Sequence, residues 1–163
     1  MKKFLCVLPL LAIGMTPALA DSGSLKVKTV KNMYNAAIKS SISEQDLDTL
    51  STLFKYSDKT LQNAIALSRV NRMSDDSMGF SECYSAYETL IINPSNGFAI
   101  QEAQSINYKV LNNGKVRASV KYTSEYTGLK DFSLTCSGNS CKITDVFDSN
   151  GSSGMRSAER LCR

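Results

Sequence analysis

One carboxylate and two tyrosines are the residues of this 163-residue chain best suited to chemistry. Asp145 stands between Ile143 and Phe147 in an alternating stretch, which predicts that it faces the concave side of a sheet. A carboxylate in apolar surroundings has a raised pKa and could serve as a general base. Tyr108 and Tyr122 are expected on the same face, where their hydroxyls could donate to a developing oxyanion. The more ordinary interpretation is a buried aspartate satisfied by backbone amides.

The chain contains no histidine, and this excludes several classes of site. Ser-His-Asp and Cys-His catalytic sets are ruled out, as is any histidine-ligated metal. Asp75 and Asp76 invite a calcium interpretation, but their spacing to Glu82 and Glu88 matches no calcium loop, so a solvated turn is the simpler prediction. We therefore expect no metal, no cofactor and no enzymatic activity.

Four cysteines follow the first 20 residues, and they allow three disulfide pairings. There is no Cys-x-x-Cys, which argues against a redox or metal role. An even count in an exported protein favours two disulfides. We favour Cys136–Cys141, which brackets a turn, and by elimination Cys83–Cys162.

The first 20 residues have the pattern of a secretory signal peptide. Lys2 and Lys3 precede an apolar stretch over residues 4–13, and Ala18-Leu19-Ala20 forms a small-residue cleavage signature. No later run approaches the roughly 18 apolar residues of a membrane span. Residues 21–163 have the length of a single domain, and the predicted location is periplasmic or secreted.

The net charge of the exported segment is small. Removing Lys2 and Lys3 from the 19 basic residues leaves 17 against 15 acidic ones. The formal net charge is then about +2, which does not resemble a nucleic-acid-binding composition. We therefore expect no nucleic acid among the partners.

Residues 102–148 are predicted to form four antiparallel strands joined by three short turns. Ile106, Tyr108 and Val110 alternate with polar residues, and so do the residues of the next strand. Because a slip of one residue would exchange the faces, Val110 should lie opposite Val116, with Gly114 in the left-handed bulge conformation.

The later turns follow the same logic. A loop over residues 126–128 predicts Tyr122 opposite Phe132, and Val120 opposite Leu134. A turn over residues 137–140 predicts Cys136 opposite Cys141 and Leu134 opposite Ile143. Asp145 is then expected opposite Phe132.

Helical spacing of apolar residues predicts three helices before the strands, over residues 25–40, 44–56 and about 58–72. Ser43 can cap the second helix. Residues 81–92 are interpreted as a short helix running into a first strand, ended at Pro94 and Gly97. Residues 98–101 are expected to begin the next strand early. A short final helix should carry Cys162 on its buried face.

The predicted fold class is α+β, with N-terminal helices packed on a bent antiparallel meander of four or more strands and a short C-terminal helix. Two segments carry a family resemblance: the turn at 113–115 with its alternating strand 116–122, and the ending 142–148 with its Gly/Ser turn and helix. Together they resemble the cone-shaped nuclear transport factor 2-like, or cystatin-like, superfamily, in particular small exported bacterial members without assigned activity. Enzymes of that superfamily often use His or Trp in the cone, and this chain has neither.

These features predict an exported, non-enzymatic binding protein that engages or neutralises another protein, such as a secreted toxin or a cell-wall hydrolase. It would use loops and an exposed sheet face, and tyrosines are frequent at such interfaces. The alternative is a small-ligand carrier or cryptic enzyme that uses a cone cavity around Asp145, Tyr108 and Tyr122. A structural subunit of an envelope assembly is a third hypothesis.

Overall fold

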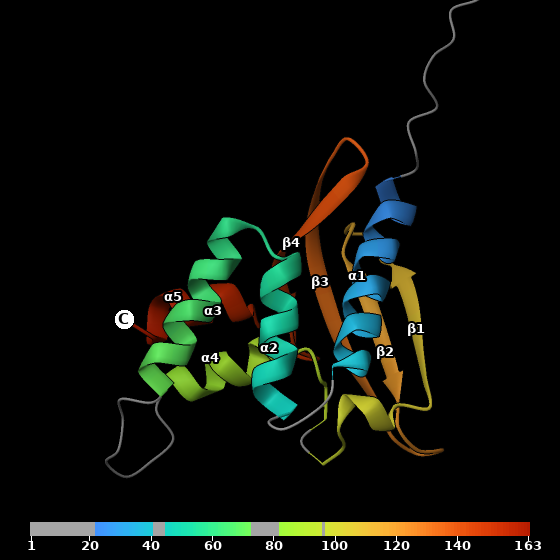
Figure 1. Ribbon diagram of the computed structural model, residues 1–163, viewed down its shortest axis with the longest axis horizontal. Helices are drawn as coiled ribbons and strands as arrows, with labels where there is room; N and C mark the ends of the chain where they lie inside the picture. Colours follow the sequence, from blue (N-terminus) through green and yellow to red (C-terminus); the bar gives the residue numbers. More distant parts are fainter. Residues whose placement is uncertain (1–21, 41–44, 73–81, 96) are drawn as a thin grey trace, which may run out of the picture.

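The computed structural model describes residues 22–40, 45–72, 82–95 and 97–163 (Figure 1). The expected signal peptide, the Ser43 cap and the Asp75–Asp76 turn lie outside these residues. The fold class is α+β, as predicted. The helices and strands follow one another as α1 (Ser22–Lys39), α2 (Gln45–Tyr56), α3 (Lys59–Arg72), α4 (Glu82–Leu90), the 3-10 turn η1 (Ile100–Glu102), β1 (Ser105–Val110), β2 (Val116–Lys121), β3 (Thr127–Ser137), β4 (Ser140–Phe147) and α5 (Gly154–Leu161).

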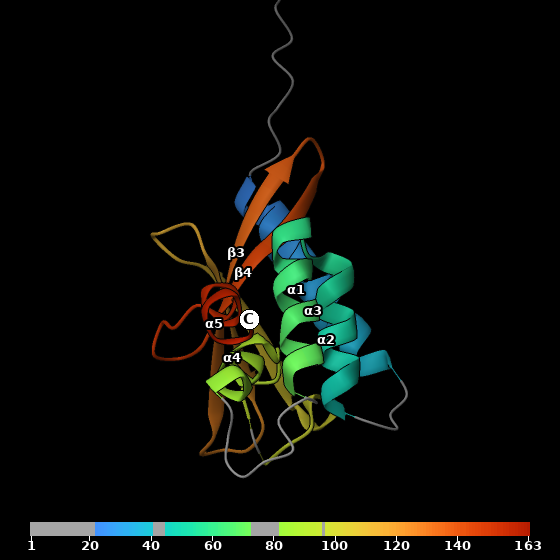
Figure 2. The same cartoon turned by 90° about the vertical axis from the view of Figure 1, so that its left-hand side faces the viewer.

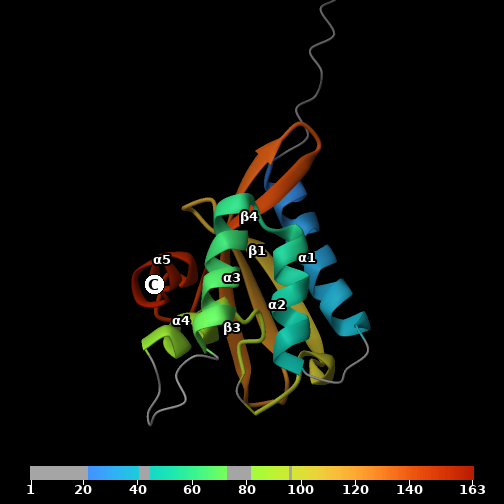
Figure 3. The same cartoon turned by 60° about the vertical axis from the view of Figure 1, so that its left-hand side comes forward.

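The strands form one antiparallel meander in the order β1-β2-β3-β4. Helix α1 crosses the sheet and contacts all four strands, because its buried residues recur every three or four positions and form one apolar stripe. Helices α3, α4 and α5 pack together beside β4 (Figures 1 and 3). One hydrophobic core joins the helices to the covered side of the sheet.

The β1–β2 register is the predicted one. Val110 lies opposite Val116 and Tyr108 opposite Ala118. Gly114 adopts φ 78°, a left-handed conformation that glycine enters without a steric penalty. The Lys26 ammonium on α1 donates to the Gly114 carbonyl at 3.1 Å, which ties the helix to this turn.

The predicted β2–β3 register is wrong by six residues. Val116, not Tyr122, lies opposite Phe132, and Val120 lies opposite Gly128. The chain reverses before residue 126 because the Thr123 hydroxyl accepts hydrogen bonds from two backbone N–H groups, those of Glu125 and Tyr126. Such side-chain turns compete with continued strand pairing. Since six is an even number, the covered and uncovered faces were still assigned correctly.

The β3–β4 turn has the predicted pairs, Cys136 with Cys141 and Leu134 with Ile143, although only residues 138 and 139 lie between the paired strands. A β-bulge at Ser133/Leu134 then shifts the register, so Asp145 lies opposite Ser133. The prediction that Asp145 lies opposite Phe132, on the face of Ile143, is therefore wrong. The bulge adds one residue to β4 and exchanges the faces beyond it.

Residues 91–95 and 97–101 do not form the predicted strands. Ile92 is buried in coil, where its carbonyl accepts a hydrogen bond from the Tyr34 hydroxyl at 2.8 Å. Pro94 has no N–H to donate to a sheet ladder, and the Asn93 side chain bonds the Phe98 carbonyl at 2.7 Å instead. Residues 100–102 form the 3-10 turn η1, not the start of a strand.

The two edges of the sheet differ. The outer edge of β4 is obstructed at two points, because Ser57 forms a parallel bridge to Ile143 and Ser153 forms an antiparallel bridge to Phe147. The Asp58 N–H also donates to the Ile143 carbonyl at 2.9 Å. The outer edge of β1 pairs with no strand of the described residues.

Both favoured disulfides are present. Cys83–Cys162 joins the start of α4 to the end of α5, with Cα atoms 4.8 Å apart, and Cys136–Cys141 spans the β3–β4 turn. Cys162 is buried, as expected for the inner face of the last helix. Across the described ranges, no helix is long and apolar enough to span a lipid bilayer.

Candidate functional site

Asp145 holds the start of helix α5. Its Oδ1 accepts hydrogen bonds from the N–H groups of Val146 at 2.8 Å and Met155 at 3.0 Å, and its Oδ2 accepts one from the Ser153 hydroxyl at 2.6 Å. Ser153 in turn caps the helix by accepting from the Arg156 N–H. The side chain is 6% exposed. This arrangement matches the more ordinary interpretation of Asp145, a buried carboxylate satisfied by backbone amides and a hydroxyl.

Tyr108 and Tyr122 lie on the covered side of the sheet, as predicted, and do not meet Asp145. The Tyr108 ring packs on Tyr34 at 6.1 Å, and burial raises the pKa of Tyr108 to about 12. The Tyr122 hydroxyl donates to the Asn93 side-chain oxygen, and burial raises the pKa of Tyr122 as well. Since the bulge turns Asp145 to the other side, the three residues do not form one site.

The side of the sheet turned away from α1 is here named the open face. Figure 2 places α1, α2 and α3 together on the covered side. Alternation along the strands directs polar residues of β1, β2 and β3 outward. The charged residues among them are Lys109, Arg117, Lys121 and Asp131. The adjoining β1–β2 turn adds Lys115.

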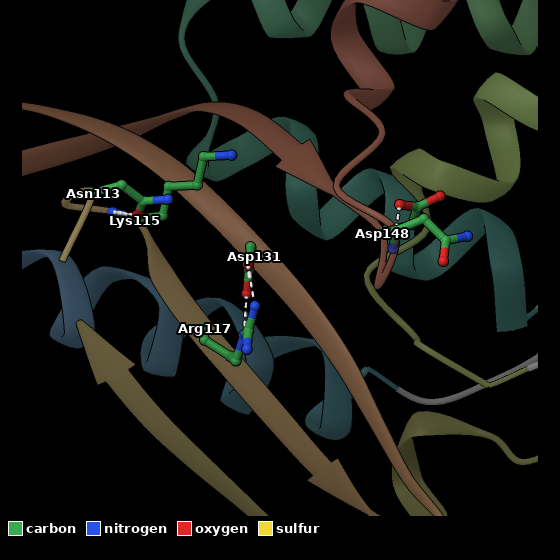
Figure 4. A network of polar contacts seen from close by, with 6 residues as sticks. Asn113, Lys115, Arg117, Asp131 and Asp148 are labelled. Atoms are coloured by element: carbon green, nitrogen blue, oxygen red, sulfur yellow. Dashed lines mark hydrogen bonds and ion pairs between the residues drawn. The ribbon is translucent and has the colours of Figure 1, made fainter. Parts of the chain in front are cut away.

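Arg117 and Asp131 form a bidentate ion pair at the centre of the open face (Figure 4). The guanidinium donates to the two carboxylate oxygens at 2.7 and 2.8 Å from the neighbouring strand. The Arg117 side chain is 39% exposed and that of Asp131 14%. The ammonium of Lys115 lies 3.1 Å from the centroid of the Phe147 ring, a cation–π contact. Both contacts hold a cationic side chain in place on the open face.

The open face has an excess of positive charge. Asp131 neutralises Arg117, whereas Lys109 and Lys121 are exposed and lie on neighbouring strands. Four cations and one anion therefore face outward from the described parts of β1, β2, β3 and the β1–β2 turn. A low-dielectric sheet behind such charges strengthens their field toward a charged partner.

A second polar feature, a hollow of about 190 Å³, lies where β3 meets the end of α4. Lys130 is 5% exposed on the covered side, between Gly128 and Phe132 in the alternation. Its Nζ donates to the carbonyls of Thr89 at 2.8 Å and Glu88 at 3.3 Å, in the last turn of α4. The hollow is lined by Glu88, Thr89, Asn93, Pro94, Leu129, Lys130, Asp148 and Ser149.

Burial lowers the pKa of Lys130 to about 8, although the carboxylates of Asp148 and Glu88 oppose that shift. Lys130 was not among the predicted site residues. The signal was present, since the positions two and four residues later, Phe132 and Leu134, were predicted to face the core.

Within the described ranges, no group of three or more Cys, Asp or Glu residues is arranged to hold a metal ion. Comparison of the chain with protein-family models, with curated proteins and with solved structures finds no match.

Proposed function

We propose that this chain is an exported, non-enzymatic protein that binds another protein through the open face, in the manner of an inhibitor or immunity protein. The partner class is a secreted toxin or a cell-wall hydrolase, which it would engage or neutralise. Kinship with the nuclear transport factor 2-like superfamily is part of the same proposal. The observation that supports a protein partner is the sheet face that α1 leaves uncovered, with its excess of cations.

Three further features support this proposal. Two disulfides suit an oxidising compartment outside the cytoplasm. The covered side of the sheet is filled by buried side chains such as Phe132 and Val146. Asp145, the residue on which the alternative of a cone cavity rested, is engaged in holding α5. A binding surface on the outside of the molecule is thus favoured over a cavity within it.

The charge of the open face defines the chemistry of the partner. The partner's surface would present carboxylates to Lys109 and Lys121. It would also present hydrogen-bond acceptors to the Arg117 guanidinium, which is paired with Asp131, and neutral polar groups between these contacts. A stable complex usually buries about 800 Å² on each partner, so the contact would extend over neighbouring Ser, Thr and Asn side chains. The small net charge of the exported segment favours an acidic protein over a nucleic acid.

The test is retention of a partner by the immobilised, oxidised segment 21–163 from envelope and culture-medium extracts, read by mass spectrometry. The open-face variant is Lys109→Glu with Lys121→Glu. The control is Lys28→Glu with Lys31→Glu, which makes the same charge change at exposed positions of α1. We expect the first variant to weaken binding of a purified partner by about tenfold or more, since facing like charges cost on the order of several kcal/mol.

The control variant should bind like the unmodified chain, and added salt should weaken the complex. Equal affinities of the two variants would overturn the assignment of the open face. Retention of nucleic acid alone, with loss in the open-face variant, would overturn the assignment of a protein partner.

A further inference from the structure

The hollow beside α4 holds an amine in a chemical setting unlike that of a surface lysine. Lys130 reaches it from the covered side of β3, opposite Ala118, whose small side chain leaves room for the lysine stem. The walls combine polar groups of Asn93 and Ser149 with apolar surface of Pro94 and Leu129. The hollow is separate from the open face, so an inference about it does not depend on the function proposed for the open face.

The two hydrogen bonds of Lys130 can both be made by the neutral form of its amine. An ammonium has three N–H donors and no acceptor. A neutral amine has two donors and one lone pair, and here two backbone carbonyls, of Glu88 and Thr89, accept from Nζ. Those carbonyls belong to the C-terminal turn of a helix, where free carbonyls attract a donor. When the amine is neutral, both donors are used and the lone pair remains for chemistry.

From this geometry we propose that Lys130 is a nucleophilic amine that forms an imine with a small, uncharged aldehyde admitted to the hollow. The Lys130 nitrogen lone pair adds to the carbonyl carbon, and a proton passes from nitrogen to oxygen to give a carbinolamine. Loss of that oxygen as water forms the C=N bond. The balance is one amine and one aldehyde giving one imine and one water, so no oxidant or reductant is required.

The lining restricts the class of aldehyde. A volume of about 190 Å³ admits only a molecule of a few non-hydrogen atoms, since ordinary ligand pockets start at about 300 Å³. Glu88 and Asp148 both line the hollow, and their negative charge opposes an aldehyde that carries a carboxylate. The hydroxyl-bearing and carboxylate-bearing aldehydes glycolaldehyde and glyoxylate, of nearly equal size, therefore form a matched pair of probes.

The availability of the neutral amine gives the size of the expected effect. With a pKa of about 8, roughly a tenth of Lys130 side chains are neutral at pH 7. For an ordinary lysine the fraction is well below a thousandth, on the order of a hundredfold less. The larger neutral fraction is partly offset by the restricted access of the aldehyde to a side chain that is 5% exposed.

The experiment treats the oxidised segment 21–163 with glycolaldehyde at pH 7, traps imines with cyanoborohydride, and locates the adducts by peptide mapping. Lys130 should be the first lysine modified, at least tenfold faster than Lys109. Its rate should level off near pH 8, whereas the rate at Lys109 should keep rising. Glyoxylate should modify Lys130 more slowly relative to Lys109 than glycolaldehyde does.

Two variants sharpen the result without removing the lysine. Glu88→Gln deletes one of the charges that stabilise the ammonium, so the Lys130 rate at pH 7 should rise severalfold; Glu125→Gln, in the exposed β2–β3 turn, should leave it unchanged. Modification of Lys130 no faster than of Lys109 would overturn the inference. So would a Lys130 adduct that forms only in urea, or a rate at Lys130 without a plateau near pH 8.

Discussion

Removal of the Cys83–Cys162 disulfide should destabilise the protein more than removal of Cys136–Cys141. The first bond closes a loop with a sequence separation of 79, for which the chain-entropy relation gives about 4.5 kcal/mol of stabilisation at 25 °C. The second closes a loop with a separation of 5, for which the same relation gives about 2 kcal/mol. The expected difference is therefore about 2.5 kcal/mol.

The location of the bonds reinforces this order. Cys83–Cys162 holds α4 against α5, and these two helices form the group packed beside β4. The β3–β4 turn is already fixed by the flanking strand pairs, Leu134 with Ile143 among them. Loss of the longer cross-link thus also frees a helix, whereas loss of the shorter one leaves a hairpin with its register set by side-chain packing.

The assay is urea unfolding of Cys83→Ala/Cys162→Ala and of Cys136→Ala/Cys141→Ala, each followed by circular dichroism without reductant. Free energies of unfolding are compared by linear extrapolation, with the slopes reported because a cross-link also changes the unfolded state. Each pair variant serves as the control for the other, since both remove one disulfide. Equal losses of stability, or a larger loss for the hairpin pair, would refute the loop-entropy reasoning.

Three further changes test other parts of the fold. Gly128→Ala should cost about 1–3 kcal/mol, because the added Cβ would lie 2.6 Å from the Pro94 ring, whereas Gly97→Ala, with no atom near its added Cβ, should have little effect in the same urea assay. Asp145→Asn should cost about 1–3 kcal/mol, because the amide nitrogen replaces an acceptor of the bonds that hold α5; a loss under ~0.5 kcal/mol would contradict that role. Lys130 titrates near pH 8 when folded and near 10.5 when unfolded, so between these values the unfolded state binds the extra proton and stability rises with pH. Relative to Lys130→Met, the unmodified chain should gain about 3 kcal/mol over that range by urea unfolding, and parallel profiles would argue against a buried amine.

The sequence was sufficient wherever one physical rule decided the structure. Matching of apolar faces set the β1–β2 register, as Tyr108 opposite Ala118 shows. An even cysteine count and a turn between two of them led to both disulfides. Helical spacing of apolar residues likewise predicted a helix over residues 25–40, where α1 lies.

The errors arose where interactions between distant segments outweighed the local pattern. The β2–β3 register depends on Thr123 and on Gly128, whose lack of a side chain lets Pro94 approach from a loop some 30 residues earlier in the chain. The bulge turns Asp145 to the other side, where its carboxylate accepts a hydrogen bond from the Met155 N–H at the start of α5. Neither interaction is visible in the alternation of a single strand.

Lys130 illustrates a different limit. Its place in the alternation pointed inward, but a lysine among apolar residues is ordinarily assigned to solvent, and only the end of α4 explains its burial. The acceptors are backbone carbonyls, which carry no signature in the sequence. A charged residue at a predicted core position is therefore itself a signal worth following.

The unequal edges of the sheet also govern how copies of this chain can assemble. Bridges from Ser57 and Ser153 obstruct the edge at β4, so among the outer edges of the described sheet β1 is the one open along its length to backbone pairing between copies. Two copies that join through β1 would form an eight-stranded sheet whose outer borders are the two β4 strands, each bridged at Ile143 and Phe147. Fibril growth requires two freely pairing borders on every subunit, so sheet extension through β1 would be expected to end at pairs.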